Sequence, residues 1–268
     1  MPYLSKIALN PRRRTAVSLL SSPHRLHAAI LAGLAVQPVS ERVLWRLESN
    51  TPHRADVLVL TENRPSWAHL VDDAGWPGAD GGAPLIADYT PLLDRIGRGR
   101  EFGFRLTANP VQNVTRPTRP SEQQSARLKE AADGGSRPRG SRVAHRTVAQ
   151  QLEWLLKRCQ RHGFAIPDAS ATPPAAGLRD GERAGEHELS AGPAVSIVSR
   201  DILRFRKHDR GPHVTLSTAT FEGRLRVTDP DALRATLLGG IGPAKGYGQG
   251  LLTLAPVRTA LIEAVAHD

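Results

Sequence analysis

Residues 239–256, GGIGPAKGYGQGLLTLAP, hold six glycines and two prolines around a short apolar run. Glycine adopts backbone conformations that other residues avoid, and it lets N–H groups come close to an anion or to another chain. The run from Leu251 to Leu254 has the apolar character of a short strand. The stretch therefore predicts a glycine-rich turn before a closing strand, and the turn either contacts an anion or serves as a flexible connection.

The spacing of these glycines does not match either common nucleotide-binding loop. A dinucleotide-binding turn requires G-x-G-x-x-G, but Lys245 stands at the third glycine position after Gly240 and Gly242. A Walker loop requires Ser or Thr after its lysine, but Gly246 follows Lys245. We therefore expect no nucleotide cofactor, and no cofactor of any other kind.

The first part of the chain shows the pattern of a βαββαβ unit. Residues 3–9 alternate between two faces, as a strand does. Ser22 can cap a helix whose first residue is Pro23. The remaining predicted elements of this unit are strands at 43–48, 57–60 and 101–108 and a short helix at 66–74. This order of elements is that of a ferredoxin-like domain.

The second part of the chain repeats this order. The helix at 147–162 carries an apolar stripe that includes Val148, Leu152 and Leu155. The other predicted elements are a helix at 229–240 and strands near 142–145, at 194–207, at 213–228 and at 250–255. The sequence therefore predicts an α+β fold of two tandem ferredoxin-like domains, each with the RRM-like βαββαβ order.

Two polar segments interrupt these elements. Residues 111–141 are rich in Pro, Gly, Ser and Arg, and they predict a flexible insertion or linker between an N-terminal domain at 1–110 and a C-terminal domain at 142–268. Residues 167–193 have a similar composition and are also expected to be poorly ordered.

The charge of the chain indicates a polyanionic partner. The formal net charge is +10 and the sequence pI is about 10.7. Of the 36 basic residues 31 are arginine, whose planar fork suits phosphate. Codon usage in a GC-rich genome explains that ratio better than function does, but it does not explain the excess of positive charge.

Other features of the composition narrow the setting. The single cysteine, Cys159, excludes an internal disulfide and a thiolate zinc cluster. The first 14 residues lack the apolar core of a signal peptide, and no apolar run approaches the length of a membrane span. We expect a soluble cytoplasmic protein that makes no membrane contact.

Seven segments give the chain a resemblance to the CasE family of CRISPR repeat endoribonucleases, which supply the crRNA-processing subunit of the type I-E Cascade complex. The resemblance covers nearly the whole chain, and the glycine-rich segment is its most specific part. The segments are YLSKIALNP at 3–11, SPHRLHAAI at 22–30, VLWRLE at 43–48, FGFRLTANP at 102–110, RVAHRTVAQQLEWLLKR at 142–158, FEGRLRVTDPDAL at 221–233 and GIGPAKGYGQGLLTLAP at 240–256.

The resemblance implies a metal-independent endoribonuclease that cleaves CRISPR precursor RNA. The cut lies at the 3′ base of the repeat hairpin, the neighbouring 2′-OH is the nucleophile, and the product carries a 2′,3′-cyclic phosphate. The enzyme then stays on the crRNA hairpin and joins the other Cascade subunits. The resemblance also implies that the glycine-rich loop supports RNA contact and the packing of the two domains.

Two histidines are the candidate catalytic residues. His27 matches the histidine of the family's Tyr-x-x-His motif, and an imidazole with an ordinary pKa near ~6.5 can act as base or acid. His24 stands where the family has tyrosine, so it either shares the proton transfers or only hydrogen-bonds the phosphate. If this replacement has removed cleavage, the protein is a hairpin-binding structural subunit of Cascade. A less favoured third hypothesis is an unrelated ferredoxin-like RNA-binding protein.

The RNA contacts are expected from basic residues and from the glycine loop. Alternation along the predicted hairpin puts Arg204 and Arg206 on one face, although a solvated hairpin tip has the same pattern. A zinc site at His24 and His27 lacks a third ligand nearby, so we expect no metal site. The four tryptophans are expected in the core or at an interface. The candidate RNA-binding residues are Arg14, Arg204, Arg206, Lys207, Arg210, Gly240, Gly242 and Lys245.

Overall fold

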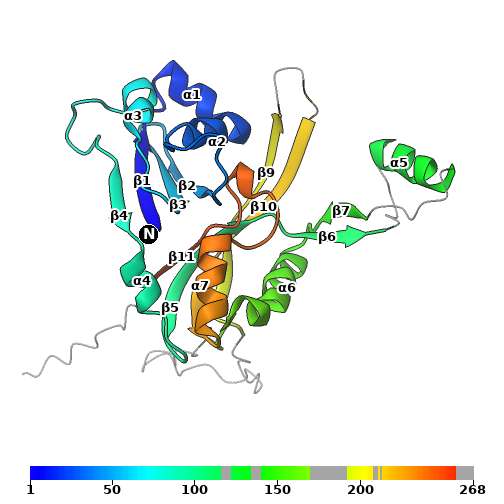
Figure 1. Cartoon of the computed structure of the whole chain (residues 1–268). Helices are drawn as coiled ribbons and strands as arrows, with labels where there is room; N and C mark the ends of the chain where they lie inside the picture. Colours follow the sequence, from blue (N-terminus) through cyan, green and yellow to red (C-terminus); the bar gives the residue numbers. More distant parts are fainter. Residues whose placement is uncertain (116–121, 134–139, 170–191, 208–210, 212, 258–268) are drawn as a thin grey trace, which may run out of the picture.

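The computed structural model describes residues 1–115, 122–133, 140–169, 192–207, 211 and 213–257. Its N-terminal part is an antiparallel sheet with the strand order β2-β3-β1-β4. Figure 1 shows α1, α2 and α3 gathered beside this sheet. The strands are β1 (Tyr3–Leu9), β2 (Leu44–Asn50), β3 (Ala55–Thr61) and β4 (Leu85–Asp88), and the helices are α1 (Arg14–Leu20), α2 (Pro23–Leu31) and α3 (Ala68–Ala74).

The second sheet has the order β11-β5-β10-β8, and β9 also pairs with β10. Along the chain β5, α6, β9, β10, α7 and β11 follow the βαββαβ order, so the α+β class and the tandem ferredoxin-like fold are confirmed. The strands are β5 (Glu101–Ala108), β8 (Phe164–Ala165), β9 (Val195–Arg206), β10 (His213–Val227) and β11 (Leu252–Pro256). The helices are α6 (Val148–Cys159), the 3-10 helix η1 (Gln160–His162) and α7 (Pro230–Gly239).

The strand at residues 101–108 lies in the second domain, although it is predicted in the first. The sequence predicts residues 101–108 as the last strand of the N-terminal unit, but β5 pairs with β10 and β11 and is the first strand of the second unit. The short β4 closes the first sheet instead by pairing with β1, and α4 (Thr90–Asp94) follows it. A boundary at residue 110 therefore assigns β5 to the wrong sheet.

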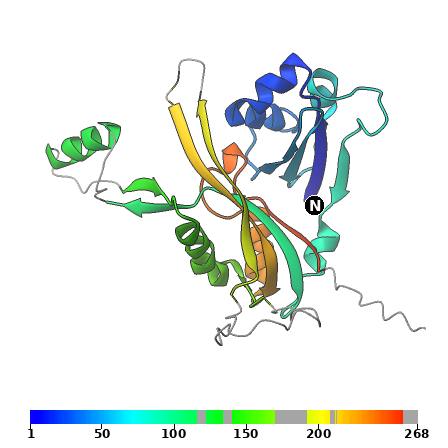
Figure 2. The same cartoon turned by 180° about the vertical axis from the view of Figure 1, so that it is seen from behind.

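The segment 111–141 also differs from its prediction as a flexible linker. Residues of this segment form β6 (Val111–Val114) and α5 (Glu122–Asp133), and β6 pairs with β7 (Ser141–Ala144). The strand predicted near 142–145 is thus β7, and it belongs to neither ferredoxin-like sheet. The ribbon of β6 and β7 extends away from the two domains (Figure 2). Most of the other polar segment, 167–193, lies outside the described residues.

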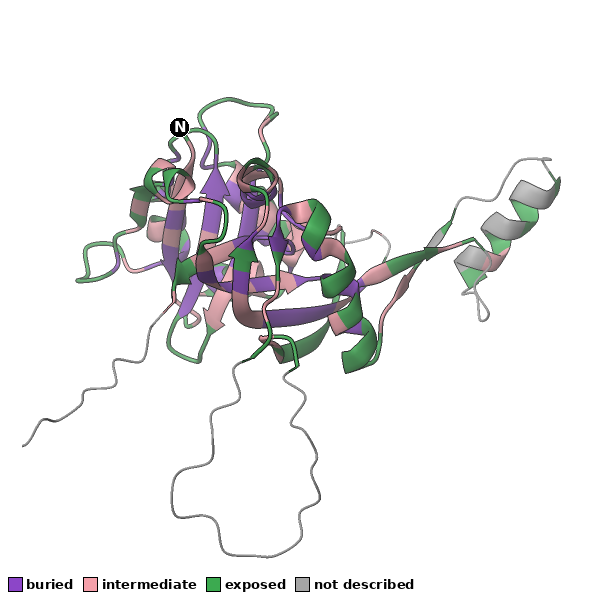
Figure 3. Ribbon diagram, turned by 90° about the horizontal axis from the view of Figure 1, so that it is seen from below, coloured by how far each residue is buried: buried purple, intermediate pink, exposed green. Residues whose placement is uncertain are grey.

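The two domains share a buried core. Successive side chains of a strand point to opposite faces. In β2, Leu44 belongs to the core cluster that contains Phe104 and Phe221 of the second domain, while Trp45 belongs to the cluster of the first domain. Buried segments run through the strands of both sheets in Figure 3. Trp45, Trp67 and Trp154 are buried, as predicted. The domains therefore pack directly against each other through one face of the first sheet.

Candidate functional site

Helix α2 carries both candidate catalytic histidines. Its start is fixed as the sequence predicts, because the Ser22 Oγ accepts a hydrogen bond from the Arg25 N–H (3.5 Å) and Pro23 is the first helical residue. Leu26 and Ile30 on the apolar stripe are buried. His24 and His27 lie beside that stripe and are both half-buried. The helix thus holds two imidazoles one turn apart at the edge of the core.

The glycine-rich loop packs directly against His27. It forms the short 3-10 helix η2 (Lys245–Tyr247), and a Cβ placed on Gly246 would lie 3.3 Å from Nε2 of His27. Gly248 has a φ of 77°, and a Cβ there would lie 2.7 Å from the ring of Trp45. Both positions thus leave no free room for a side chain. Because these two glycines have no side chain, the backbone of the loop can contact both His27 of α2 and Trp45 of the core.

The two glycines predicted to contact RNA have a packing role in the structure. Gly240 and Gly242 have φ values of 73° and 81°, which favour glycine. A Cβ on Gly240 would lie 2.9 Å from Leu44, and a Cβ on Gly242 would lie 3.0 Å from Trp154. These positions join the loop to both domains, and this accounts for part of the permissive backbone of residues 239–256.

The surroundings of His27 favour the neutral form of its ring. Burial lowers the pKa of His27 below its ordinary value of 6.5, and the nearby charge of His24 lowers it further. Nδ1 of His27 is buried and has no hydrogen-bond partner among the described residues. Nε2, on the side of Gly246, is therefore the nitrogen left to exchange a proton with a ligand.

One predicted histidine, His24, and the end of the predicted basic strand meet at one hollow, whereas His27 lies one turn further along α2 and does not line it. This hollow has a volume of about 240 Å³, and we name it the α2–β9 hollow. Its walls are the start of α2 on one side and the end of β9 with the following lysine on the other. The lining residues are Ser21, Ser22, His24, Arg25, Phe205, Arg206 and Lys207.

Arg25 is a member of this hollow that sequence reasoning missed. Its guanidinium donates to Ser18 Oγ (3.0 Å). The only sequence signal was its place between His24 and His27, since a lone arginine on a helix is usually solvated. Arg25 adds a second guanidinium to the hollow, opposite Arg206.

The other predicted residues lie at different places. Arg204 lies on β9 on the same strand face as Arg206, as the alternation predicts, and lines the neighbouring interdomain cavity. Arg14 is the first residue of α1, is exposed and does not line the α2–β9 hollow. Arg210 lies outside the described residues. Lys245 opens η2, and burial together with the charge of Arg42 lowers its pKa.

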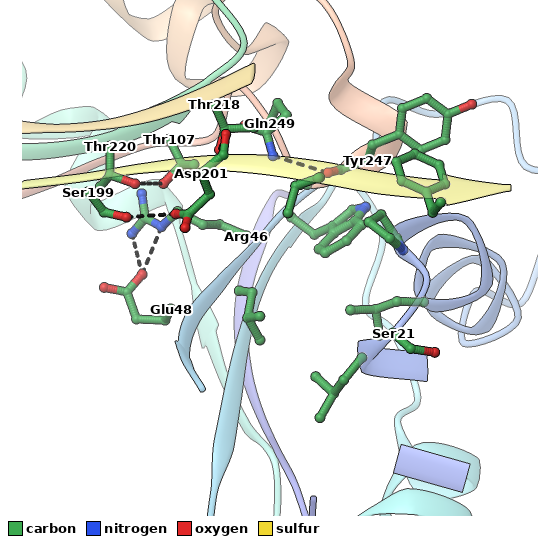
Figure 4. A pocket seen from close by; sticks show the side chains of 18 of the residues that line it. Ser21, Arg46, Glu48, Thr107, Ser199, Asp201, Thr218, Thr220, Tyr247 and Gln249 are labelled. Atoms are coloured by element: carbon green, nitrogen blue, oxygen red, sulfur yellow. Dashed lines mark hydrogen bonds and ion pairs between the residues drawn. The ribbon is translucent and has the colours of Figure 1, made fainter. Parts of the chain in front are cut away.

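The interdomain cavity that Arg204 lines has a volume of about 290 Å³ and lies next to the α2–β9 hollow. Figure 4 shows Arg46 and Glu48 with serine and threonine side chains of the second domain at one end, and Tyr247 at the other. The ring of Tyr247 meets that of Phe205 edge-on at 4.9 Å. Phe205 lines both spaces, so it links the loop to the α2–β9 hollow.

Arg46 ties the two domains together inside this cavity. Its side chain is 2 % exposed, and Nη1 donates to the backbone oxygens of Arg105 (3.0 Å) and Leu251 (3.1 Å) in the second domain. Nε donates to Glu48 Oε2 at 2.8 Å. Burial lowers the pKa of Arg46 and Glu48 opposes this shift, so the guanidinium stays charged.

Two further observations concern predicted absences. Across the residues that the structure describes, no three His, Cys, Asp or Glu side chains gather where they could hold a metal ion. In the same part of the chain, no helix is long and apolar enough to cross a membrane.

The fold and the site define a protein with two ferredoxin-like domains that presents a histidine pair beside a basic strand. The chain belongs to the CRISPR-associated protein family, whose model matches residues 2–256. It is 30 % identical over 264 residues to the CRISPR-associated endoribonuclease Cse3 of Thermus thermophilus, and the match covers 95 % of this chain and 100 % of Cse3.

Another relative and a solved structure agree with this membership. The CRISPR system Cascade subunit CasE of Escherichia coli (strain K12) is 29 % identical over 218 residues, which are 80 % of this chain and 89 % of CasE. A structure of Thermus thermophilus Cse3 bound to an RNA representing a pre-cleavage complex matches with a TM-score of 0.66 and 30 % identity. That match covers 95 % of this chain and 99 % of the other.

Proposed function

We propose that this protein is the endoribonuclease that processes CRISPR precursor RNA in a type I-E Cascade system. It cleaves at the 3′ base of the repeat hairpin without a metal ion, and it stays on the crRNA hairpin with the other Cascade subunits in the cytoplasm. Membership of the family and the names of the relatives, an endoribonuclease and a Cascade subunit, support this proposal. The observation that carries it is His27, which packs against Gly246, lies one turn from the basic α2–β9 hollow, and has a pKa lowered by burial.

His27 acts on the proton of the 2′-OH. Nε2 accepts this proton while the 2′ oxygen attacks the adjacent phosphorus, and the bond from phosphorus to the 5′ oxygen breaks on the opposite side. The departing oxygen takes a proton and becomes a 5′-OH, and the other product end is a 2′,3′-cyclic phosphate. His24 lies in the α2–β9 hollow and is the candidate for this second proton transfer.

The basic residues of the α2–β9 hollow bind the phosphate. Arg25, Arg206 and Lys207 bring positive charge to the place where negative charge develops on the phosphate oxygens. Arg204 lies one step along the same face of β9 and extends the basic surface toward the hairpin stem. Charged contacts of this kind position the RNA, but they do not read its sequence. We also propose that Arg14, Arg210 and Lys245 contact RNA phosphates outside the α2–β9 hollow.

A second candidate function is a structural subunit that binds the hairpin without cutting it. The observation that favours it is His24, which stands at the family's tyrosine position. Both functions require hairpin binding, but only the first requires proton transfer at His27.

The experiment that separates them compares wild type, His27→Ala and His53→Ala on repeat RNA. We expect His27→Ala to lower the single-turnover cleavage rate by about 10²–10⁴-fold, the range for a general acid or base, and to change hairpin affinity less than about twofold. His53 is exposed and lies outside the α2–β9 hollow, so its replacement is the matched control. A wild type that binds without cutting would establish the structural subunit, and loss of binding in His27→Ala would show a structural histidine.

A further inference from the structure

A second basic hollow lies on the other side of the glycine loop, and the reasoning from sequence did not find it. We name it the α6 hollow; its volume is about 580 Å³. One wall is α6 with η1, another is the β6–β7 ribbon, and the third is the glycine loop. Its basic residues are Arg142, Lys157, Arg158, Arg161 and Lys245.

Positive charge is in large excess in this hollow. Five arginine and lysine side chains line it together with one carboxylate, that of Glu153, which pairs with Lys157 at 2.5 Å. Within the described residues, no carboxylate lies within 4.0 Å of the charged nitrogens of Arg158, Arg161 or Lys245. These three charges are therefore available to an anionic ligand.

The walls of the hollow hold Arg158 and His162 in place. The guanidinium of Arg158 lies 4.3 Å from the ring centre of Trp154 and donates to the Trp154 backbone oxygen at 2.9 Å. Arg161 lies beside His162, whose Nδ1 is 2.9 Å from Thr236 Oγ1. The indole N–H of Trp154 is buried and has no acceptor among the described residues. Arg158 and Lys245 are thus half-buried and held in place, while Arg142, Lys157 and Arg161 are exposed at the rim of the hollow.

The mutual repulsion of these groups also points to an anion. Burial and the charges of Arg161, Arg158 and Lys245 lower the pKa of His162 to about 4. Burial and the charge of Arg42 lower the pKa of Lys245. A bound phosphate would relieve this repulsion, because it brings negative charge into a partly desolvated space.

The α6 hollow adjoins His27 through the glycine loop. Lys245 lines it, and the next residue along η2, Gly246, packs on His27. The basic strand β9 approaches α2 from the opposite direction, at the α2–β9 hollow. An RNA strand that passes His27 therefore meets basic residues on both sides of the scissile bond.

We propose that the α6 hollow binds the phosphates of the single-stranded RNA that flanks the repeat hairpin, while β9 binds the hairpin itself. The proposal rests on the proposed function. Arginine forks suit phosphate oxygens, and Gln112 and Asn113 of β6 add neutral polar groups to the wall. The hollow thereby places the strand that leaves the hairpin base and fixes the register of the cut.

The test uses a double variant, Arg142→Gln with Arg161→Gln, and repeat RNA made uncleavable by a 2′-deoxy at the cut. Four RNAs are compared: the hairpin with both flanks, without the 5′ flank, without the 3′ flank, and alone. We expect the variant to bind flanked RNA about 10-fold more weakly at about 0.15 M salt, and the slope of log K against log salt to fall by about 0.7 for each phosphate that it no longer neutralises, the value for single strands. Binding of the bare hairpin should stay within about twofold of wild type.

Arg98→Gln with Arg100→Gln is the matched control, because it also removes two positive charges, from exposed residues outside the α6 hollow. The flank whose removal abolishes the difference between variant and wild type is the one that occupies the hollow. Equal weakening on the bare hairpin would overturn the assignment to a flank, and no weakening on any RNA would overturn RNA binding at the hollow. Cleavage by wild type, measured in parallel on unmodified RNA, reports separately on the proposed function.

Discussion

The contact between Gly246 and His27 leads to a prediction for Gly246→Ala. The new Cβ would lie 3.3 Å from Nε2 and 3.4 Å from Cδ2 of the imidazole, closer than the roughly 3.5–4.0 Å of a relaxed contact. The φ of Gly246 is not positive, so the backbone accepts alanine, and only the contact is strained. The ring or the loop must then move by a few tenths of an ångström. The free energy of unfolding should fall by about 1 kcal/mol, the low end for an overpacked site.

Catalysis should respond more strongly than stability to this displacement. A misplacement of about 1 Å can cost about 10²-fold in rate, so a shift of a few tenths should lower the single-turnover cleavage rate about tenfold. Hairpin affinity should stay within about twofold. Gly239→Ala is the control in the same stretch, because its Cβ would meet nothing within 4 Å. An unchanged cleavage rate in Gly246→Ala, with Gly239→Ala also unchanged, would refute the claim that the loop positions His27.

Three further predictions concern single side chains. Arg46→Ala should lower the free energy of unfolding in urea by about 1–3 kcal/mol, because it removes a donor from the buried Leu251 oxygen and leaves Glu48 with only Arg105 as its ion-pair partner; an unchanged free energy would contradict this role. The acidic limb of the cleavage pH profile should lie below 6.5, since burial and His24 lower the pKa of His27, and His24→Gln should move the limb of the residual rate to higher pH. Burial and nearby positive charges lower the pKa of His162 to about 4 in the folded protein, against 6.5 in the unfolded chain. Its contribution to the free energy of unfolding is therefore complete above pH 6.5 and is lost as the pH falls toward 4. In thermal melts over that pH range, His162→Gln should lose less stability than wild type.

The elements themselves were largely predictable from sequence because their signals are local. The cap at Ser22, the alternation in 3–9 and the apolar stripe of α6 all depend on neighbours within a few residues. Sheet membership is not local. The strand at 101–108 alternates equally well in either domain, and only its pairing with β10, far along the chain, decides the sheet. The strand β4 is short and mostly exposed, so it gives no clear alternation.

The site residues were predictable where the family resemblance identifies individual positions. They were not predictable where the fold brings together charged residues that are distant in the sequence. His24, His27 and Arg206 were predicted singly, and the structure brings the start of α2 to the end of β9. The α6 hollow draws on residues far apart in the chain, from β6 to the glycine loop, and its helix charges resemble an ordinary solvated face. Of the ribbon that forms one wall, β7 was predicted as a strand but β6 was predicted as part of a linker, because its few apolar residues give little strand signal.

The measurement that tests the central claim most directly is cleavage in EDTA of two repeat RNAs that differ by one 2′-deoxy, at the nucleotide before the cut. The account predicts that the protein binds both RNAs, cuts only the unmodified one, and leaves a 2′,3′-cyclic phosphate. Cutting of the 2′-deoxy RNA, or binding of both RNAs with no cutting of either, would contradict it.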